Sequence, residues 1–253
     1  MIKGDLRMMK IYAHRGNKSE FPENSILAFQ SAIELGVDGI ECDVHVSKDG
    51  KAIIIHDETI DRTSTGQGEI KEMTLADIKA VQLLNPDNSP SEEKIPTLSE
   101  MLEAFDTLKF NGALNIELKT DQHAYEGIEA LVKELVEAKP RTYTIIYSSF
   151  NWTSIQRMAQ LQPNAELALL LAQPLLAYQP LISSLAPHAL HVDYKLVDHL
   201  DEAYQKTLPL RLWTVNETAA LEKWFSATDT KVEAIMTDYP RQALKMRALS
   251  NMS

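Results

Sequence analysis

Short apolar runs alternate along the chain with longer segments in which apolar residues recur every three or four positions. Most of the short runs are continuously apolar, which is typical of parallel strands covered on both faces. The longer segments have the periodicity of amphipathic helices, so strand and helix alternate almost throughout the chain. Nine short runs are predicted as strands, at residues 10–14, 39–44, 52–56, 113–119, 143–149, 167–171, 189–193, 210–215 and 233–238.

Helix ends are visible in several of the longer segments. In ENSILAFQSAIELG, Asn24 or Ser25 can cap the start of a helix and Gly36 can end it. In TLSEMLEAF, Thr97 and Glu100 have the spacing of a capping box. Further amphipathic helices are predicted in GIEALVKELVEA and NETAALEKWF.

This alternation predicts βα units around a parallel sheet, and a closed (β/α)8 barrel, the TIM barrel, best fits a chain of 253 residues. We predict one domain over residues 1–253, with about 1–9 and 247–253 disordered. A small insertion or extended loop is expected after the third strand. The polar, proline-bearing stretch at residues 83–96 is such a segment, and its position over the barrel mouth or elsewhere on the surface is left open.

Nine predicted strands compete for eight places in the barrel. The runs on either side of Asp49-Gly50 are too close together for a crossover helix, which needs about a dozen residues. Residues 51–56 therefore form an antiparallel hairpin arm or an irregular barrel strand, and the sequence leaves both open. Pairing about the Asp-Gly turn brings His56 close to Asp43.

Composition and charge narrow the range of partners. A net charge of −11 argues against nucleic acid or an anionic membrane surface as the main partner. The single cysteine, Cys42, excludes an internal disulfide and fits a reducing compartment. No secretory pattern is visible, and the longest apolar run, LALLLAQPLLA, is shorter than the ~20 residues that span a bilayer. We predict a cytoplasmic protein without stable membrane insertion; homo-oligomerisation is left open.

Carboxylates lie at the ends of two predicted strands. Glu41 and Asp43 are two residues apart, so both side chains point to the same face of one strand, and Glu117 lies in another. In a parallel barrel the carboxyl ends of the strands meet at one mouth. Three converging carboxylates repel one another unless a cation or protons hold them, and oxygen ligands favour Mg²⁺ or Ca²⁺.

Basic residues occupy the same strand ends. His14 and His56 each end a predicted strand, and two imidazoles can act as general base and general acid in one turnover. Arg15 and Lys119 supply the local positive charge that an acidic protein needs in order to bind a phosphate. This combination predicts a metal-assisted site for phosphoryl transfer.

The chain resembles the glycerophosphodiester phosphodiesterase family in motifs that follow the family's order: AHRGNKSEFPENSILAF, GIECDVHVSKDGKAIIIHD, IDRTSTGQG, NIELK, SSF, WTVN and MTDYP. Ser25 stands where threonine is usual. The resemblance implies a phospholipase C-like TIM barrel of the cytoplasmic bacterial type. It further implies metal-dependent hydrolysis of a small glycerophosphodiester to sn-glycerol 3-phosphate and an alcohol.

The resemblance also implies a role for each matching residue. These roles are acid–base catalysis for His14 and His56, phosphate binding for Arg15 and Lys119, metal ligation for Glu41, Asp43 and Glu117, and lining of the substrate pocket for Trp213 and Phe150.

Neighbouring residues are expected to have supporting roles. Asp57 is expected to orient its neighbours, and Glu23 and Asn24 to shape the loop after the first strand. Cys42 is expected to face the helix layer. His45 shares the side of Glu41 and Asp43 but lies further along the strand, so we expect it to point to solvent. The histidines without a motif are expected to be surface or packing residues: His123, His188, His191 and His199.

Two other functions compete with this interpretation. One is a phospholipase D-like activity on lysophospholipids that uses the same barrel and metal; an apolar rim around the pocket would favour it. The other is a phosphoester-binding protein without catalytic activity, against which the presence of both histidines and all three carboxylates counts.

Overall fold

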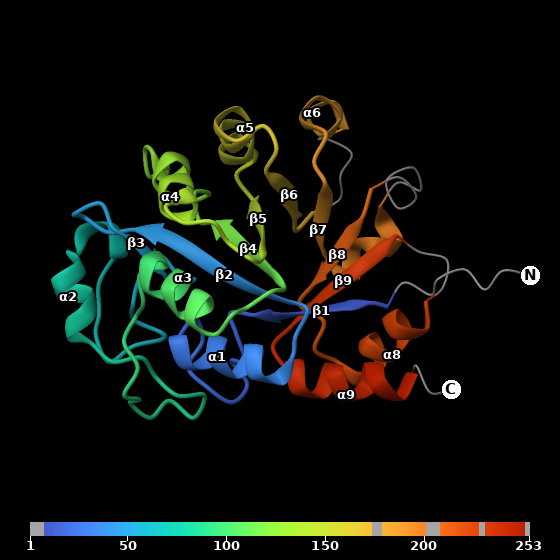
Figure 1. The fold of residues 1–253 in the computed structure, drawn as a ribbon, viewed down its shortest axis with the longest axis horizontal. Helices are drawn as coiled ribbons and strands as arrows, with labels where there is room; N and C mark the ends of the chain where they lie inside the picture. Colours follow the sequence, from blue (N-terminus) through green and yellow to red (C-terminus); the bar gives the residue numbers. More distant parts are fainter. Residues whose placement is uncertain (1–7, 174–178, 201–207, 228–230, 251–253) are drawn as a thin grey trace, which may run out of the picture.

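The structure is a computed structural model that describes residues 8–173, 179–200, 208–227 and 231–250. Within these ranges eight parallel strands close into a barrel, because β1 pairs with both β2 and β9. The predicted TIM barrel is confirmed, and Figure 1 shows the strands inside a ring of helices. The strands are β1 (Lys10–His14), β2 (Gly39–Val46), β3 (Ala52–Ile54), β4 (Ala113–Leu118), β5 (Thr144–Ser149), β6 (Glu166–Leu171), β7 (Ala189–Asp193), β8 (Leu210–Trp213) and β9 (Val232–Thr237).

The predicted capping residues mark both ends of the first helix and the start of the helix that follows Thr97. The Ser25 side chain accepts from the backbone N–H of Ala28 at the start of α1, and Gly36 ends that helix with a φ of 77°. Thr97 and Glu100 form the predicted capping box of α3. The described α-helices are α1 (Ile26–Leu35), α2 (Leu75–Ala80), α3 (Leu98–Thr107), α4 (Ile128–Glu137), α5 (Trp152–Leu161), α6 (Gln179–Leu185), α8 (Thr218–Ser226) and α9 (Pro240–Ser250), and the 3₁₀ helices are η1 (Ile70–Glu72) and η3 (Tyr194–His199).

Alternate residues of each barrel strand face the helix layer and the barrel interior. On β2, Ile40, Cys42 and Val44 belong to the large apolar cluster between strands and helices, and none of them is exposed. Cys42 therefore packs in the helix layer, as predicted. Each large apolar side chain buried in this way contributes about 1.5–3 kcal/mol. The other face of β2, with Glu41 and Asp43, points into the barrel.

The strand β3 is not part of the barrel. It pairs antiparallel with β2, so that Val44 lies opposite Ile54, and the hairpin alternative for residues 51–56 is the one that the structure shows. Figure 1 shows β3 and α2 beside the barrel at the left of the view. Residues 83–96 contribute Leu83 and Ile95 to the separate apolar cluster that holds this arm together. The other buried members of that cluster are Ile53, Ile55, Ile60, Ile70 and Ile78.

Part of the C-terminal segment that was predicted to be disordered is helical. Residues 247–250 belong to helix α9. Arg247 pairs with Asp38 and donates from Nη1 to the main-chain oxygen of Met9 at 2.9 Å, which ties this helix to the first strand. Residues 1–7 and 251–253 lie outside the described residues. Among the described helices, none combines the length and the apolar character that crossing a bilayer requires.

A polar cluster lies inside the barrel, near the amino ends of the strands. Arg211 of β8 pairs with Glu166 of β6 and donates from Nε to Glu233 of β9 at 2.7 Å. Its Nη1 lies 3.4 Å from Nε2 of His191, which has no exposed surface. Burial, with the positive charge of Arg211, lowers the pKa of His191 well below its ordinary value of 6.5.

His191 is expected to make folding less favourable at low pH. The unfolded chain binds a proton at the ordinary pKa, whereas folded His191 stays neutral, so the free energy of unfolding falls as the pH drops below about 6.5. His191 accounts for up to about 1.4 kcal/mol per pH unit of this fall. Urea unfolding between about pH 5 and about pH 7.5 should therefore show a shallower pH dependence for His191→Asn than for the wild type. Identical slopes would contradict the prediction.

Candidate active site

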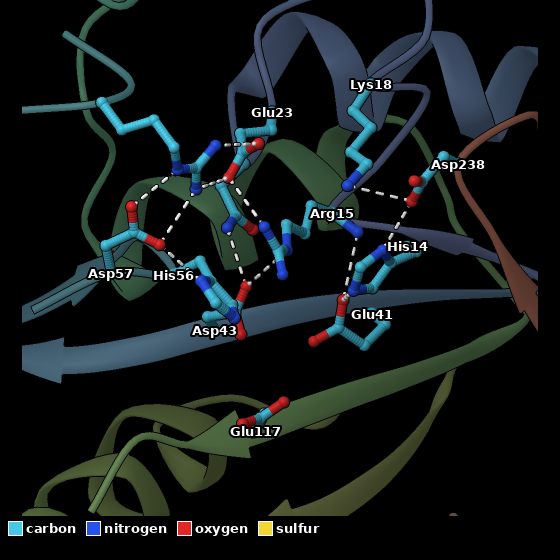
Figure 2. A network of polar contacts seen from close by, with 12 residues as sticks. His14, Arg15, Lys18, Glu23, Glu41, Asp43, His56, Asp57, Glu117 and Asp238 are labelled. Atoms are coloured by element: carbon cyan, nitrogen blue, oxygen red, sulfur yellow. Dashed lines mark hydrogen bonds and ion pairs between the residues drawn. The ribbon is translucent and has the colours of Figure 1, made fainter. Parts of the chain in front are cut away.

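The three predicted metal ligands meet at the carboxyl ends of the barrel strands. Asp43 on β2 lies directly opposite Glu117 on β4. Glu41 lies two residues before Asp43, so its side chain is on the same face of β2. Each of the three carboxylates offers an oxygen within 4.8 Å of the others, and all three residues are buried. Figure 2 shows Glu117 on the neighbouring strand, across from Glu41 and Asp43.

The electrostatics of this cluster fit a divalent cation. Glu41 Oε1 and Asp43 Oδ1 are buried oxygens without a hydrogen-bond donor, which is costly unless a cation takes that place. Burial, with the charge of Asp43 and Glu117, raises the pKa of Glu41 well above its ordinary range, and burial also raises the pKa of Glu117. Lys119 Nζ lies 2.8 Å from Glu117 Oε1. Burial opposes ionisation of Asp43, but Arg15 and Lys119 hold its pKa below the ordinary value.

The loop after β1 places Arg15 beside the carboxylates. Arg15 has a φ of 59°, and its N–H donates to the main-chain oxygen and to Oε2 of Glu41, both at 3.1 Å. Its Nε lies 3.3 Å from Asp43 Oδ2, and its Nη1 donates to Glu23 at 3.0 Å. The next residue, Gly16, has a φ of 79°, and a Cβ there would lie 2.8 Å from the backbone of Ala28. Glycine is therefore required for α1 to pack this closely against the loop.

Asn24 contacts the carboxylates directly. Its backbone has a φ of 55°, its N–H donates to the oxygen of Arg15 at 3.0 Å, and its Nδ2 donates to Asp43 Oδ2 at 2.9 Å. Glu23 and Asn24 were expected only to shape the loop, yet both touch site residues. The signal for this was weak, because the sequence alone gives no distance between the loop after β1 and strand β2.

The imidazole of His14 is held through its Nδ1. Asp238, which follows β9, accepts from this nitrogen at 2.6 Å, and Lys18 Nζ lies 3.0 Å from the same carboxylate oxygen. Asn216 donates to the other oxygen of Asp238 at 2.9 Å. The proton therefore lies on Nδ1, and the free Nε2 lies 3.9 Å from Glu41 Oε2. Burial, together with the positive charge of Arg15, lowers the pKa of His14 to about 4.

His56 has a matching arrangement on the hairpin arm. Asp57 accepts from its Nδ1 at 2.6 Å, as expected of a residue that orients its neighbours. Arg62 binds Asp57 through Nε at 2.7 Å and also donates to both oxygens of Glu23. Figure 2 shows the two histidine–aspartate pairs at opposite ends of the network, with Glu23 and Arg15 between them.

Two aromatic residues line part of the cavity. The rings of Phe150 and Trp213 lie edge to face with centroids 5.6 Å apart, and Lys119 Nζ lies 6.0 Å from the centre of the Phe150 ring. Both residues line a cavity of about 100 Å³ that also reaches the two histidines and two of the three carboxylates, Glu41 and Glu117. The cavity is lined by His14, Arg15, Glu41, His56, Asn115, Glu117, Phe150, Leu170, Trp213, Thr214 and Met236.

The prediction that His45 points to solvent is wrong. His45 has no exposed surface, and its ring contacts the Tyr125 hydroxyl and the main-chain oxygen of His56, both at 3.0 Å. The hairpin arm and the β4–α4 loop cover this end of β2, which strand periodicity could not show. Asp238 and Lys18 were also missed, although Asp238 belongs to MTDYP at the end of the last strand.

The sequence and the fold have close relatives. The profile of the Glycerophosphoryl diester phosphodiesterase family matches residues 14–242. A glycerophosphodiester phosphodiesterase of Caldanaerobacter subterraneus is 34% identical over 239 residues, covering 93% of this chain and 96% of the relative. One from Bacillus altitudinis is 33% identical over 248 residues, covering 95% and 98%. A phosphodiesterase of Oleispira antarctica, solved with its product sn-glycerol-3-phosphate, is 25% identical with a TM-score of 0.80, covering 97% and 98%.

The fold and the site together place the chain among the TIM-barrel phosphodiesterases. More narrowly, the chain belongs to the Glycerophosphoryl diester phosphodiesterase family, because the family profile and the relatives each cover most of its length.

Proposed function

We propose that this protein hydrolyses glycerophosphodiesters to sn-glycerol 3-phosphate and an alcohol, with the help of a divalent cation. The observation that carries the proposal is the placement of two imidazoles, each anchored through Nδ1, around a cavity lined by Glu41 and Glu117. Together with the adjacent Asp43, these two residues form a carboxylate cluster able to hold a metal ion. Such a cavity offers both proton transfer and charge stabilisation to a phosphodiester.

Glu41, Asp43 and Glu117 would hold the cation, which we propose to be Mg²⁺ or Ca²⁺ because the cluster offers only carboxylate oxygens. When bound, it would supply Lewis-acid polarisation of the phosphoryl oxygens. Bringing a cation next to Glu41 and Glu117 also displaces the proton that their raised pKa values favour, so the affinity for metal should fall at low pH.

The basic residues would bind the phosphate and transfer protons. We assign Arg15 and Lys119 to binding the phosphate, since both are buried cations at the cavity or beside its wall. With Nδ1 bound to an aspartate, His14 and His56 each keep Nε2 for the substrate, so that one accepts a proton and the other donates one. Phe150 and Trp213 would contact the apolar part of the substrate.

A direct assay tests this function. Purified protein with Mg²⁺ or Ca²⁺ is expected to release sn-glycerol 3-phosphate from glycerophosphocholine and glycerophosphoethanolamine, measured with a coupled enzyme. Lysophosphatidylcholine is the comparison substrate, and faster turnover of this lipid would favour the phospholipase D-like alternative. Absence of turnover with every substrate and metal, or release of phosphocholine instead, would overturn the proposal.

Three further statements stay predictions from the sequence: a single catalytic domain over residues 1–253, a cytoplasmic location, and the absence of nucleic-acid partners.

A further inference from the structure

His56 does not lie on a barrel strand. It follows β3, which pairs antiparallel with the end of β2 and lies beside the barrel. The N–H of Ile55 donates to the main-chain oxygen of Asp43 at 3.1 Å, one residue before His56. The orientation of the His56 ring toward the cavity therefore depends on how firmly this arm is fixed to β2.

A buried imidazole binds the main chain of His56. Nε2 of His45 lies 3.0 Å from the main-chain oxygen of His56, and His45 has no exposed surface. A carbonyl oxygen can only accept, so Nε2 carries the proton and Nδ1 of the neutral ring is an acceptor. The Tyr125 hydroxyl lies 3.0 Å from that Nδ1 and therefore donates to it.

Tyr125 comes from a different part of the chain than the hairpin arm. It lies in the loop between β4, which carries Glu117, and α4, and it has a φ of 38°. Its ring meets the His45 ring edge to face, with centroids 5.6 Å apart and an interplanar angle of 87°. The two hydrogen bonds thus connect the loop that follows the metal and phosphate residues of β4 with the arm that carries His56.

We propose that Tyr125 and His45 are positioning residues that hold the main chain of His56, so that its ring meets the phosphodiester in the geometry required for proton transfer. The inference rests on the acid–base role proposed for His56. Both residues act through the His56 carbonyl, so they contribute to the chemical step more than to substrate binding. A shift of about 1 Å in a reacting group can cost about a hundredfold in rate.

Kinetics with the purified holoenzyme test the proposal. His45→Leu removes the donor and is expected to lower kcat roughly 10- to 100-fold, with KM within about twofold of the wild type. His45→Gln keeps an N–H that can reach the same oxygen, and should retain kcat within about threefold. Tyr125→Phe removes only the hydroxyl and should lower kcat by about three- to tenfold.

His123→Leu is the matched control. His123 lies on the same loop, and its ring meets Tyr125 edge to face at 5.9 Å, so this variant changes a contact of Tyr125 without touching its hydroxyl. We expect its kcat within about twofold of the wild type. Equal losses for His45→Leu and His45→Gln, or a loss confined to KM, would overturn the proposal.

The tautomer of His45 gives a second readout that does not depend on turnover. Long-range ¹H–¹⁵N spectra, assigned by the loss of signals in His45→Gln, should show protonated Nε2 and unprotonated Nδ1. The opposite tautomer would refute the hydrogen-bond chain. Failure of the proposed function would look different: His56→Ala would then keep the wild-type kcat. An inactive His56→Ala with a fully active His45→Leu would refute only the positioning role.

Discussion

Removal of divalent cations is expected to lower turnover of glycerophosphodiesters by about a thousandfold or more, and addition of Mg²⁺ or Ca²⁺ to restore it. The reason lies in the cluster of Glu41, Asp43 and Glu117, where buried oxygens of the first two have no hydrogen-bond donor. A cation that polarises a phosphoryl oxygen stabilises the transition state by several kcal/mol, which corresponds to a rate change of this size. The measurement is kcat after treatment with EDTA and titration with each metal.

Thermal unfolding measures metal binding at the same site independently of enzymatic activity. A ligand that binds only the folded state raises the melting temperature, so the wild type should be stabilised by the metal that restores turnover. Asp43→Asn should lose this stabilisation, because it removes one ligand charge from the cluster. Glu34→Gln, at a carboxylate on α1 that accepts a hydrogen bond from Gln30, is the matched control and should respond like the wild type. Full activity after chelation, or an unchanged metal response in Asp43→Asn, would contradict the metal site.

Replacing His14 by alanine is expected to lower kcat by about 10²- to 10⁴-fold, which is the usual contribution of a positioned general acid or base. Asp238 and His14 form one unit, since Asp238 accepts from Nδ1 at 2.6 Å and fixes the tautomer. Asp238→Ala should therefore lower kcat by at least about tenfold. The double variant should be no slower than His14→Ala alone, because the effects of residues that act as a unit are not additive.

Steady-state kinetics at saturating metal measure this coupling when the wild type, the two single variants and the double variant are compared. His199→Ala is the control, because His199 is exposed on η3 and no described contact links it to the cavity. Additive losses for the pair would show that Asp238 does not act through His14. Unchanged kcat in His14→Ala would remove His14 from the chemical step.

Local patterns account for much of what could be predicted. Continuous apolar runs predicted the barrel, and capping residues predicted both ends of α1 and the start of α3. The two-residue spacing of Glu41 and Asp43 predicted that both side chains lie on the same face of the strand. Successive side chains of a strand point to opposite faces, whatever the fold around it. A parallel barrel then brings Glu117 to the same mouth.

Other features depend on contacts that no local pattern contains. His45 has the same parity as Glu41, but its burial depends on Tyr125, which is 80 residues away along the chain. Likewise, Asp238 reaches His14 across 224 residues, because the barrel closes β9 against β1. Residue spacing along one strand predicts the face of the sheet on which each side chain lies. It does not predict a hydrogen-bond partner on a distant segment, which depends on how the strands close into the barrel.

The sequence alone determined the class of fold, the strand ends that carry carboxylates, histidines and cations, and the family to which they belong. The tertiary structure decided the rest: residues 51–56 form a hairpin arm, two aspartates fix the tautomers of His14 and His56, and His45 binds the arm that carries His56. The physical reason is that side-chain direction follows from local backbone geometry. Hydrogen-bond partners and burial follow from the packing of segments that the sequence leaves far apart.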